Sequence, residues 1–173
     1  MAVTDAESTG RPILVAVTGG IAAYKSAYLV SRLVQSGHDV HVLMTEAATR
    51  FVTPLTFETL SGRPVHVSLW EQVASHHAAH IALARAAQLL IIAPASANTI
   101  AKLAHGLCDN LVTTVACALP RQPIATPVVF APAMNAEMWA NPMTRHNAAA
   151  LREELGYVQV GPDDGWQACR TAG

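Results

Sequence analysis

The sequence predicts a single α/β domain built in three layers, with a parallel sheet covered by helices on both faces. Short, largely apolar runs of strand length alternate with longer segments whose apolar residues recur at helical spacing. Strands that are apolar throughout are buried on both faces, and helices are the usual connection between such strands in a parallel sheet. The length of 173 residues fits one domain, which we expect at 12–173 after a disordered leader at 1–11.

The first half of the chain contains two predicted strands and two predicted helices. In chain order these are a strand at 13–17 ended by Thr18-Gly19-Gly20, a helix at 22–34 ended by Gly37, a strand at 40–44 followed by Thr45-Glu46-Ala47, and a helix at 54–61 opened by Pro54. The stretch that follows, 62–80, is the least regular part of the sequence, and we assign it no element.

The second half returns to a clear alternation of strands and helices. It predicts a strand at 89–93 ended by Pro94, a helix capped by Ser96 and Asn98 and closed at Gly106, a helix capped by Asp109 and running through Ala118, a strand at 128–131 ended by Pro132, a helix opened by Asn141-Pro142 and stopped at Gly156, and a strand at 157–160. Five strands therefore alternate with helices along the whole chain.

Composition excludes several classes of protein. No apolar run reaches the roughly 18 residues that span a bilayer, and the first dozen residues lack the apolar core of a signal peptide. The net charge of −1 and the scattered basic residues do not form a nucleic-acid surface. Cys108, Cys117 and Cys169 form no C-x-x-C pair, which favours free thiols in a reducing cytoplasm. Only 13% of the residues are charged, so we expect some surface to be buried between subunits.

In open parallel sheets, ligands bind beyond the carboxyl ends of the strands, which here selects the loops 18–22, 45–47, 94–99 and 132–139. Gly19 and Gly20 allow the backbone to approach an anion at the start of a helix, although a plain tight turn explains them as well. Their spacing is not G-x-G-x-x-G, so a nicotinamide dehydrogenase using Glu46 for a ribose hydroxyl is disfavoured.

Polar side chains in two other loops suit an anion or a carboxylate. The segment 94–99 brings Ser96, Asn98 and free backbone N–H groups to a helix start, which suits a phosphate, although both side chains can also be ordinary caps. The amide of Asn135 can donate a hydrogen bond to a carboxylate without neutralising it. The alternative is that Asn135 caps a helix ahead of Glu137.

Three histidines, His76, His77 and His80, lie close together in the irregular stretch. A zinc site needs three or four ligands, and no cysteine or carboxylate lies at matching spacing, so we expect no metal. A single catalytic histidine is favoured, and His80 is the candidate because the apolar Ile81-Ala82-Leu83 directly after it would anchor it.

Six motifs resemble those of the homo-oligomeric flavin-containing cysteine decarboxylases, in family order and spacing. They are Gly19-Gly20-Ile21-Ala22-Ala23-Tyr24-Lys25, Met44-Thr45-Glu46-Ala47, His80-Ile81, Pro94-Ala95-Ser96-Ala97-Asn98-Thr99, Gly106-Leu107-Cys108-Asp109-Asn110-Leu111, and Pro132-Ala133-Met134-Asn135 followed by Met138-Trp139. The match runs from about residue 12 to residue 169.

The resemblance implies a Rossmann-like, flavodoxin-like fold, a trimer or a multiple of trimers with the flavin between subunits, and a set of site residues. FMN would be held by Gly19, Gly20, Ile21, Thr45, Ala47, Ser96, Ala97, Asn98, Thr99 and Ala133. His80 matches the active-site histidine, Asn135 the residue that holds the substrate carboxylate, and Met138 a substrate contact. The flavin would oxidise the thiol-bearing carbon, which makes loss of carbon dioxide possible, and the protein would supply placement.

The family divides after decarboxylation, and the end of this sequence leaves two substrates open. Gln167-Ala168-Cys169 resembles the start of the segment whose cysteine reduces the product in coenzyme A synthesis, but Arg170-Thr171-Ala172-Gly173 departs from the glycine-rich continuation. A missing clamp and the absence of a synthetase domain favour a peptidyl-cysteine decarboxylase, which acts on the C-terminal cysteine of a precursor peptide related to lantibiotics. The alternative is a phosphopantothenoylcysteine decarboxylase with Cys169 as proton donor. A non-catalytic flavin-binding subunit is disfavoured because His80 is present.

Overall fold

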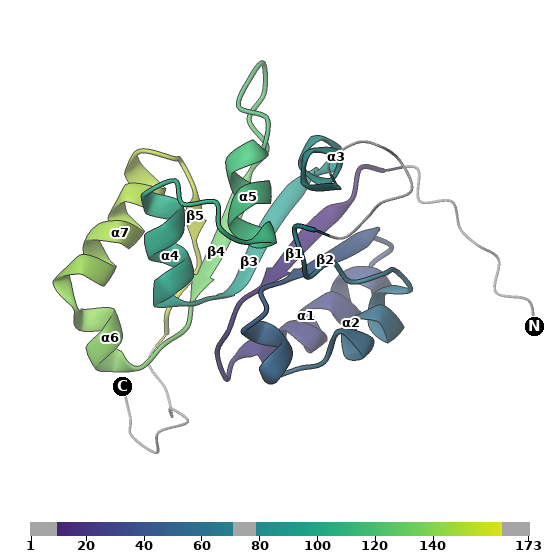
Figure 1. The fold of residues 1–173 in the computed structure, drawn as a ribbon, viewed down its shortest axis with the longest axis horizontal. Helices are drawn as coiled ribbons and strands as arrows, with labels where there is room; N and C mark the ends of the chain where they lie inside the picture. The colour runs from purple at the N-terminus through teal and green to yellow at the C-terminus, as the bar shows by residue number, and fades with distance from the viewer. Residues whose placement is uncertain (1–9, 71–78, 164–173) are drawn as a thin grey trace, which may run out of the picture.

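The computed structural model describes residues 10–70 and 79–163 and contains a five-stranded, all-parallel sheet (Figure 1). The strand order is β2-β1-β3-β4-β5. The strands are β1 (Ile13–Val17), β2 (Val40–Met44), β3 (Leu89–Ala95), β4 (Val128–Pro132) and β5 (Val158–Gln159). The chain adds β2 on one side of β1 and then crosses to add β3 on the other side. The carboxyl ends of β1 and β3 therefore lie side by side at the centre of the sheet. This confirms the predicted flavodoxin-like α/β fold.

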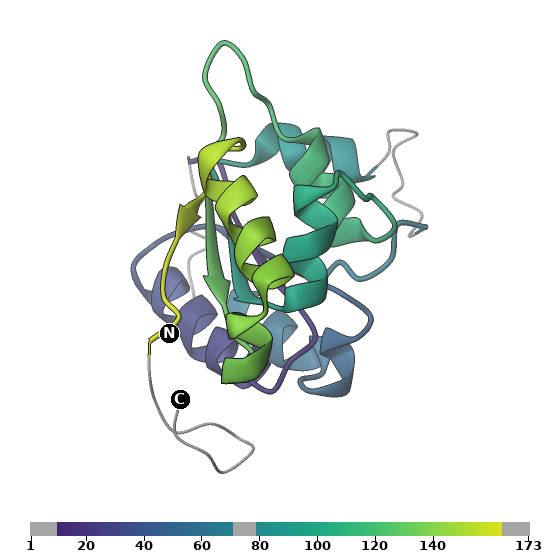
Figure 2. The same ribbon diagram turned by 90° about the vertical axis from the view of Figure 1, so that its left-hand side faces the viewer.

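Helices cover both faces of the sheet. They are α1 (Ala23–Gln35), a short 3₁₀ helix η1 (Ala48–Arg50), α2 (Pro54–Ser61), α3 (Ala79–Ala86), α4 (Ala97–Ala104), α5 (Leu111–Ala118), α6 (Ala136–Ala140) and α7 (Pro142–Glu153). Side chains of a β-strand alternate between the two faces. Val15 packs with α1 and α2, whereas Leu14 packs with α3, α4, α5 and α7. Figure 2 shows α4, α5 and α7 gathered on one side of the strands.

The predicted elements agree closely with the observed ones, with three differences. The cap of α5 is Asn110, whose Oδ1 accepts from the Thr113 N–H at 3.1 Å, and not Asp109, which instead pairs with Lys102. Residues 79–86 form α3, where no helix was predicted. The reason is that α3 has only eight residues, half of them alanine, and few large apolar side chains to mark its buried face. The sequence also gave no prediction for η1.

Helical cover is uneven on the face that carries α1. Phe130 of β4 packs against the α4, α5 and α7 side, so its neighbour Val129, and Val158 paired with it on β5, point to the opposite side. Val158 and Val160 are each more than half exposed there. Among the helices of the described residues, none therefore lies above this apolar strip along β4 and β5.

Candidate functional site

Thr18 joins the loops that follow the two central strands. Its side chain is fully buried, and its hydroxyl donates to the Pro94 carbonyl at 2.7 Å and accepts from the Ser96 N–H at 3.0 Å. A second hydroxyl, Ser26 Oγ of α1, donates to the Ala93 carbonyl at 2.6 Å. Because each polar group is buried and paired, these bonds fix the end of β3 relative to the β1–α1 turn.

Gly19 allows the loop after β2 to approach the loop after β1. A Cβ atom placed on Gly19 would lie 2.6 Å from the Cβ of Ala47 and 3.3 Å from its carbonyl carbon. Thr45 anchors the same loop, since its N–H donates to the Val17 carbonyl at 3.0 Å and its Oγ1 accepts from the Ala48 N–H at 3.3 Å. A side chain at position 19 would push these two loops apart.

The loop after β4 is the fourth of the loops at the carboxyl edge of the sheet. The Ala133 N–H donates to the Ala95 carbonyl at 3.2 Å. All four loops are thus connected into one edge by three contacts, which are Gly19 with Ala47, Thr18 with Ser96, and Ala95 with Ala133. The structure brings together every residue predicted to hold the cofactor, namely Gly19, Gly20, Ile21, Thr45, Ala47, Ser96, Ala97, Asn98, Thr99 and Ala133.

Two helices begin at this edge. Helix α1 begins after Ala22, which has no side-chain cap, but its first three N–H groups already donate to the carbonyls of the turn before it at 3.0–3.5 Å. Helix α4 begins after Ser96 and is the one that can offer backbone donors. Ser96 Oγ accepts from the Thr99 N–H at 3.3 Å and donates to Thr99 Oγ1 at 3.1 Å, so these two side chains serve as the helix cap. The first N–H groups of a helix have no partner within it and favour a bound anion. The exposed Asn98 adds an amide beside them.

A groove of about 300 Å³ opens next to this edge, between α1 and the ends of β3 and β4. Its lining is mainly apolar and backbone, with Lys25 and Asp163 as the charged members. The residues are Ala22, Lys25, Ser26, Leu29, Ala93, Pro94, Ala131, Pro132, Ala133, Val160, Gly161, Pro162 and Asp163. Such a surface suits a flat, largely apolar ring whose tail reaches the polar loops.

Asn135 and Met138 lie just past the loop after β4. Asn135 Oδ1 accepts from the Glu137 N–H at 2.9 Å and caps α6, as the alternative interpretation of the sequence expected. This bond fixes the direction of the amide NH₂ group, which is the part able to donate to a carboxylate. The side chain of Met138 is half exposed on α6.

His80 lies apart from the four loops of its own chain. It belongs to the first turn of α3, and the end of this helix is tied to the edge where the strands begin. Arg11, just before β1, donates to the carbonyls of Arg85, Ala86 and Ala87 at 2.7–3.2 Å. A helix rises 1.5 Å per residue, so His80 lies about 9 Å from Ala86 along α3. The seven residues of β3 span about 23 Å, so the loops at the far end of that strand are much farther away. Figure 1 shows α3 near the end of the sheet opposite the β1–α1 turn.

Other predicted residues lie outside the described residues, namely His76, His77 and Cys169. Within residues 10–70 and 79–163, no group of three histidine, cysteine, aspartate or glutamate side chains could hold a metal ion. No helix in that part of the chain is long and apolar enough to cross a membrane. The expected cytoplasmic location stays a prediction.

The family model described as Flavoprotein matches residues 1–172. The chain belongs to the flavoprotein family. It is 47% identical over 163 residues to a probable phosphopantothenoylcysteine decarboxylase of Streptococcus mutans, covering 94% of this chain and 89% of that protein. It is 45% identical to a bifunctional coenzyme A biosynthesis protein of Vibrio cholerae, covering 95% of this chain but only 40% of that longer protein.

Solved structures agree with the assignment of this chain to the flavoprotein family. The FMN-dependent cysteine decarboxylase SpaF superposes with a TM-score of 0.80 at 32% identity, covering 94% of this chain and 89% of the other. A PPC decarboxylase mutant complexed with pantothenoylaminoethenethiol also gives a TM-score of 0.80 at 32% identity, covering 95% of this chain and 88% of the other. The predicted family, that of FMN-dependent cysteine decarboxylases, is confirmed, and with it the FMN cofactor.

The buried hydroxyl of Thr18 is a positioning group that the sequence interpretation missed. A polar residue directly after a fully apolar strand was the available signal. We expect Thr18→Val, which keeps the shape but leaves the Ser96 N–H without its acceptor, to cost about 1–3 kcal/mol of unfolding free energy and to weaken flavin retention. Thr18→Ser keeps the hydroxyl and is the matched control. Urea unfolding and absorbance of bound flavin measure both effects, and equal behaviour of the two variants would contradict this role.

Proposed function

We propose that this flavoprotein decarboxylates phosphopantothenoylcysteine in coenzyme A synthesis, with FMN held along the edge formed by the four loops. The observation that carries the proposal is the 47% identity to the Streptococcus mutans protein across nearly the whole length of both chains. The bifunctional relatives from Vibrio cholerae and Escherichia coli support the same pathway, although this chain spans only about 40% of their length.

This proposal replaces the peptidyl-cysteine decarboxylase that the sequence favoured. That preference depended on the short chain and its unusual last residues. The Streptococcus mutans relative is also short, since 89% of it is covered by this chain, so length does not distinguish the two substrates. SpaF and TvaF are FMN-dependent cysteine decarboxylases with 32% and 31% identity, TvaF being from thioviridamide biosynthesis. A peptide substrate therefore remains the second candidate.

The loops fit the parts of FMN. The backbone donors at the start of α4, together with Asn98, suit the phosphate, and the close approach at Gly19 keeps side chains out of that space. The groove beside α1 suits the ring. Bound there, FMN would supply the two-electron oxidation of the thiol-bearing carbon of the substrate. Asn135, fixed by its bond to α6, donates to the substrate carboxylate and leaves it ionised, as carbon dioxide loss requires.

His80 acts on a flavin held by a neighbouring copy in this proposal. The distance of α3 from the loops of its own chain leaves His80 unable to serve them without rearrangement. The uncovered strip that includes Val158 and Val160 supplies an apolar surface for assembly. We propose a trimer or a multiple of trimers, and Cys169 as the proton donor that completes the product.

Two substrates offered separately to the purified, yellow protein test the proposal. We expect phosphopantothenoylcysteine to lose one carbon dioxide and no hydrogen atoms, as mass spectrometry of the product would show, because this reaction as a whole involves no net oxidation of the substrate. A synthetic peptide ending in cysteine should stay unchanged. Protein freed of flavin is the control for background reaction. Loss of carbon dioxide and two hydrogen atoms from the peptide, with the pantothenoyl compound untouched, would overturn the proposal in favour of the second candidate.

A further inference from the structure

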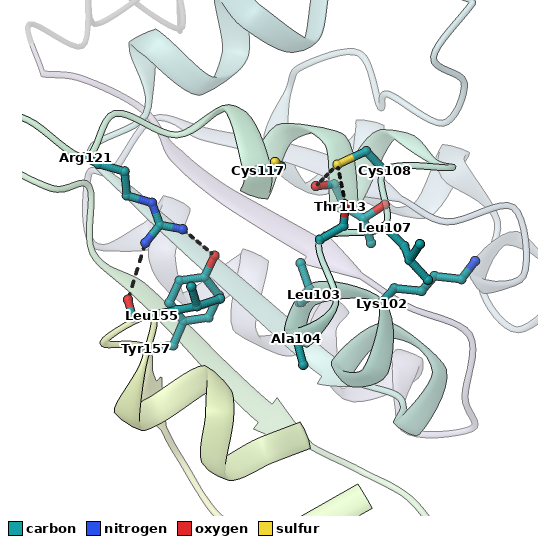
Figure 3. Close-up of a pocket in the computed structure, with 11 residues that line it drawn as sticks. Lys102, Leu103, Ala104, Leu107, Cys108, Thr113, Cys117, Arg121, Leu155 and Tyr157 are labelled. Atoms are coloured by element: carbon teal, nitrogen blue, oxygen red, sulfur yellow. Dashed lines mark hydrogen bonds between the residues drawn. The ribbon is translucent and has the colours of Figure 1, made fainter. Parts of the chain in front are cut away.

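A small pocket on the other face of the sheet contains two cysteines that the proposed decarboxylation does not use. The pocket has a volume of about 160 Å³ and lies between α4, α5 and the segment before β5 (Figure 3). Its wall includes Cys108 and Cys117 on one side and Arg121 and Tyr157 on the other. It shares no lining residue with the groove beside α1.

The loop that carries Cys108 is bound to the helix that carries Cys117. Thr114 Oγ1 donates to the Cys108 carbonyl at 3.2 Å, and Cys108 Sγ lies 3.9 Å from the Thr113 carbonyl oxygen. Thr113 and Cys117 are four residues apart in α5 and therefore occupy the same face of that helix. The sulfur of Cys108 is thus held beside the face from which Cys117 projects, as Figure 3 shows.

The Cys117 thiol is close enough to affect Cys108. Burial and the neighbouring Cys117 thiol raise the pKa of Cys108 above its usual value, and the nearby Asp109 acts in the same direction. Both cysteines are nevertheless exposed residues, so a small solute can reach them. Cys108 belongs to a loop between two helices, where the backbone can adjust to the narrow range of Cα separations that a disulfide needs.

We propose that Cys108 and Cys117 form a reversible, redox-active dithiol that closes to a disulfide by exchange with low-molecular-weight disulfides. The Cys117 thiolate attacks one sulfur of the small disulfide, which forms a mixed disulfide and releases one small thiolate. Cys108 then loses its proton and attacks Cys117 Sγ, which expels the second small thiolate. The protein loses two electrons and two protons, and both go to the two released thiols. Cys108 acts second because its raised pKa disfavours its thiolate at neutral pH.

Tryptic mapping of the oxidised holoenzyme tests this proposal sharply. No lysine or arginine lies between Lys102 and Arg121, so both cysteines fall in the peptide Leu103–Arg121, whereas Cys169 falls in Glu153–Arg170. After incubation with oxidised glutathione and alkylation with iodoacetamide, we expect Leu103–Arg121 to lose two hydrogen atoms and to escape alkylation. Dithiothreitol should restore two alkylation sites.

A single-cysteine variant supplies the control. In Cys108→Ser the exchange should stop at the first step and leave one glutathione on Cys117, because the resolving thiol is gone. The proposal is overturned if the wild-type peptide carries two glutathiones, if it is alkylated twice after treatment, or if it becomes linked to Glu153–Arg170. The wild-type map decides the matter even if the variant fails to fold.

Discussion

Gly19→Ala is expected to remove most of the bound FMN, because the new methyl group would lie 2.6 Å from the Cβ of Ala47. The loops after β1 and β2 must then separate, and both contribute to the proposed phosphate end of the site. Overpacking at a well-packed contact costs about 1–3 kcal/mol. If that cost falls on the bound state, affinity drops by roughly five- to a hundredfold.

Two matched variants isolate the cause. Gly20→Ala introduces the same methyl group one residue later, where no atom of the chain lies within 4 Å, so it should retain more flavin than Gly19→Ala. Ala47→Gly combined with Gly19→Ala removes the atom that is struck and should recover part of the affinity. Titration of FMN into flavin-free protein, followed by absorbance, measures each variant. Unchanged binding in Gly19→Ala, or no recovery in the double variant, would contradict the loop contact.

The strands and the loops after them could be predicted because they depend on local patterns. Apolar runs marked the strands, and Thr-Gly-Gly and Pro-Ala-Ser marked their ends. The parallel order then places those ends on one edge. The contact between Gly19 and Ala47 could not be predicted, since it joins loops 28 residues apart (47 − 19) and depends on their packing. The approach of Cys108 to the helix that carries Cys117 also depends on packing and could not be predicted from local patterns.

For Ser96 and Asn135, the capping role and the functional role that were weighed as alternatives are compatible with each other. Ser96 and Asn135 both cap helices, as the simpler interpretation expected, yet both lie on the edge that the functional interpretation selected. Capping orients these residues, because an oxygen fixed on a backbone N–H determines where the rest of the side chain points. In Asn135, the NH₂ group is the part of the amide that can donate to the substrate carboxylate.

His80→Asn is expected to keep FMN but to lower decarboxylation by about 10²–10⁴-fold, the usual contribution of a general acid or base. The position of α3 explains why the flavin should stay, since Arg11 ties the end of this helix to the edge where the strands begin, opposite the four loops. Absorbance of the purified variant reports the flavin, and release of carbon dioxide from phosphopantothenoylcysteine reports the reaction. Full activity with bound flavin would remove His80 from the mechanism.

Co-expression of two inactive variants determines whether His80 serves its own flavin or a neighbour's. A Gly19→Ala chain keeps His80 but holds little flavin, and a His80→Asn chain holds flavin but lacks the histidine. If each site combines the loops of one copy with His80 of the next, random equal mixing gives roughly a quarter of the sites both intact parts. If each site lies within one chain, every chain carries one lesion and the mixture shows no more activity than the two variants measured separately. Two affinity tags, one on each variant, isolate the mixed oligomers, so a lack of activity in that fraction would reject the shared site.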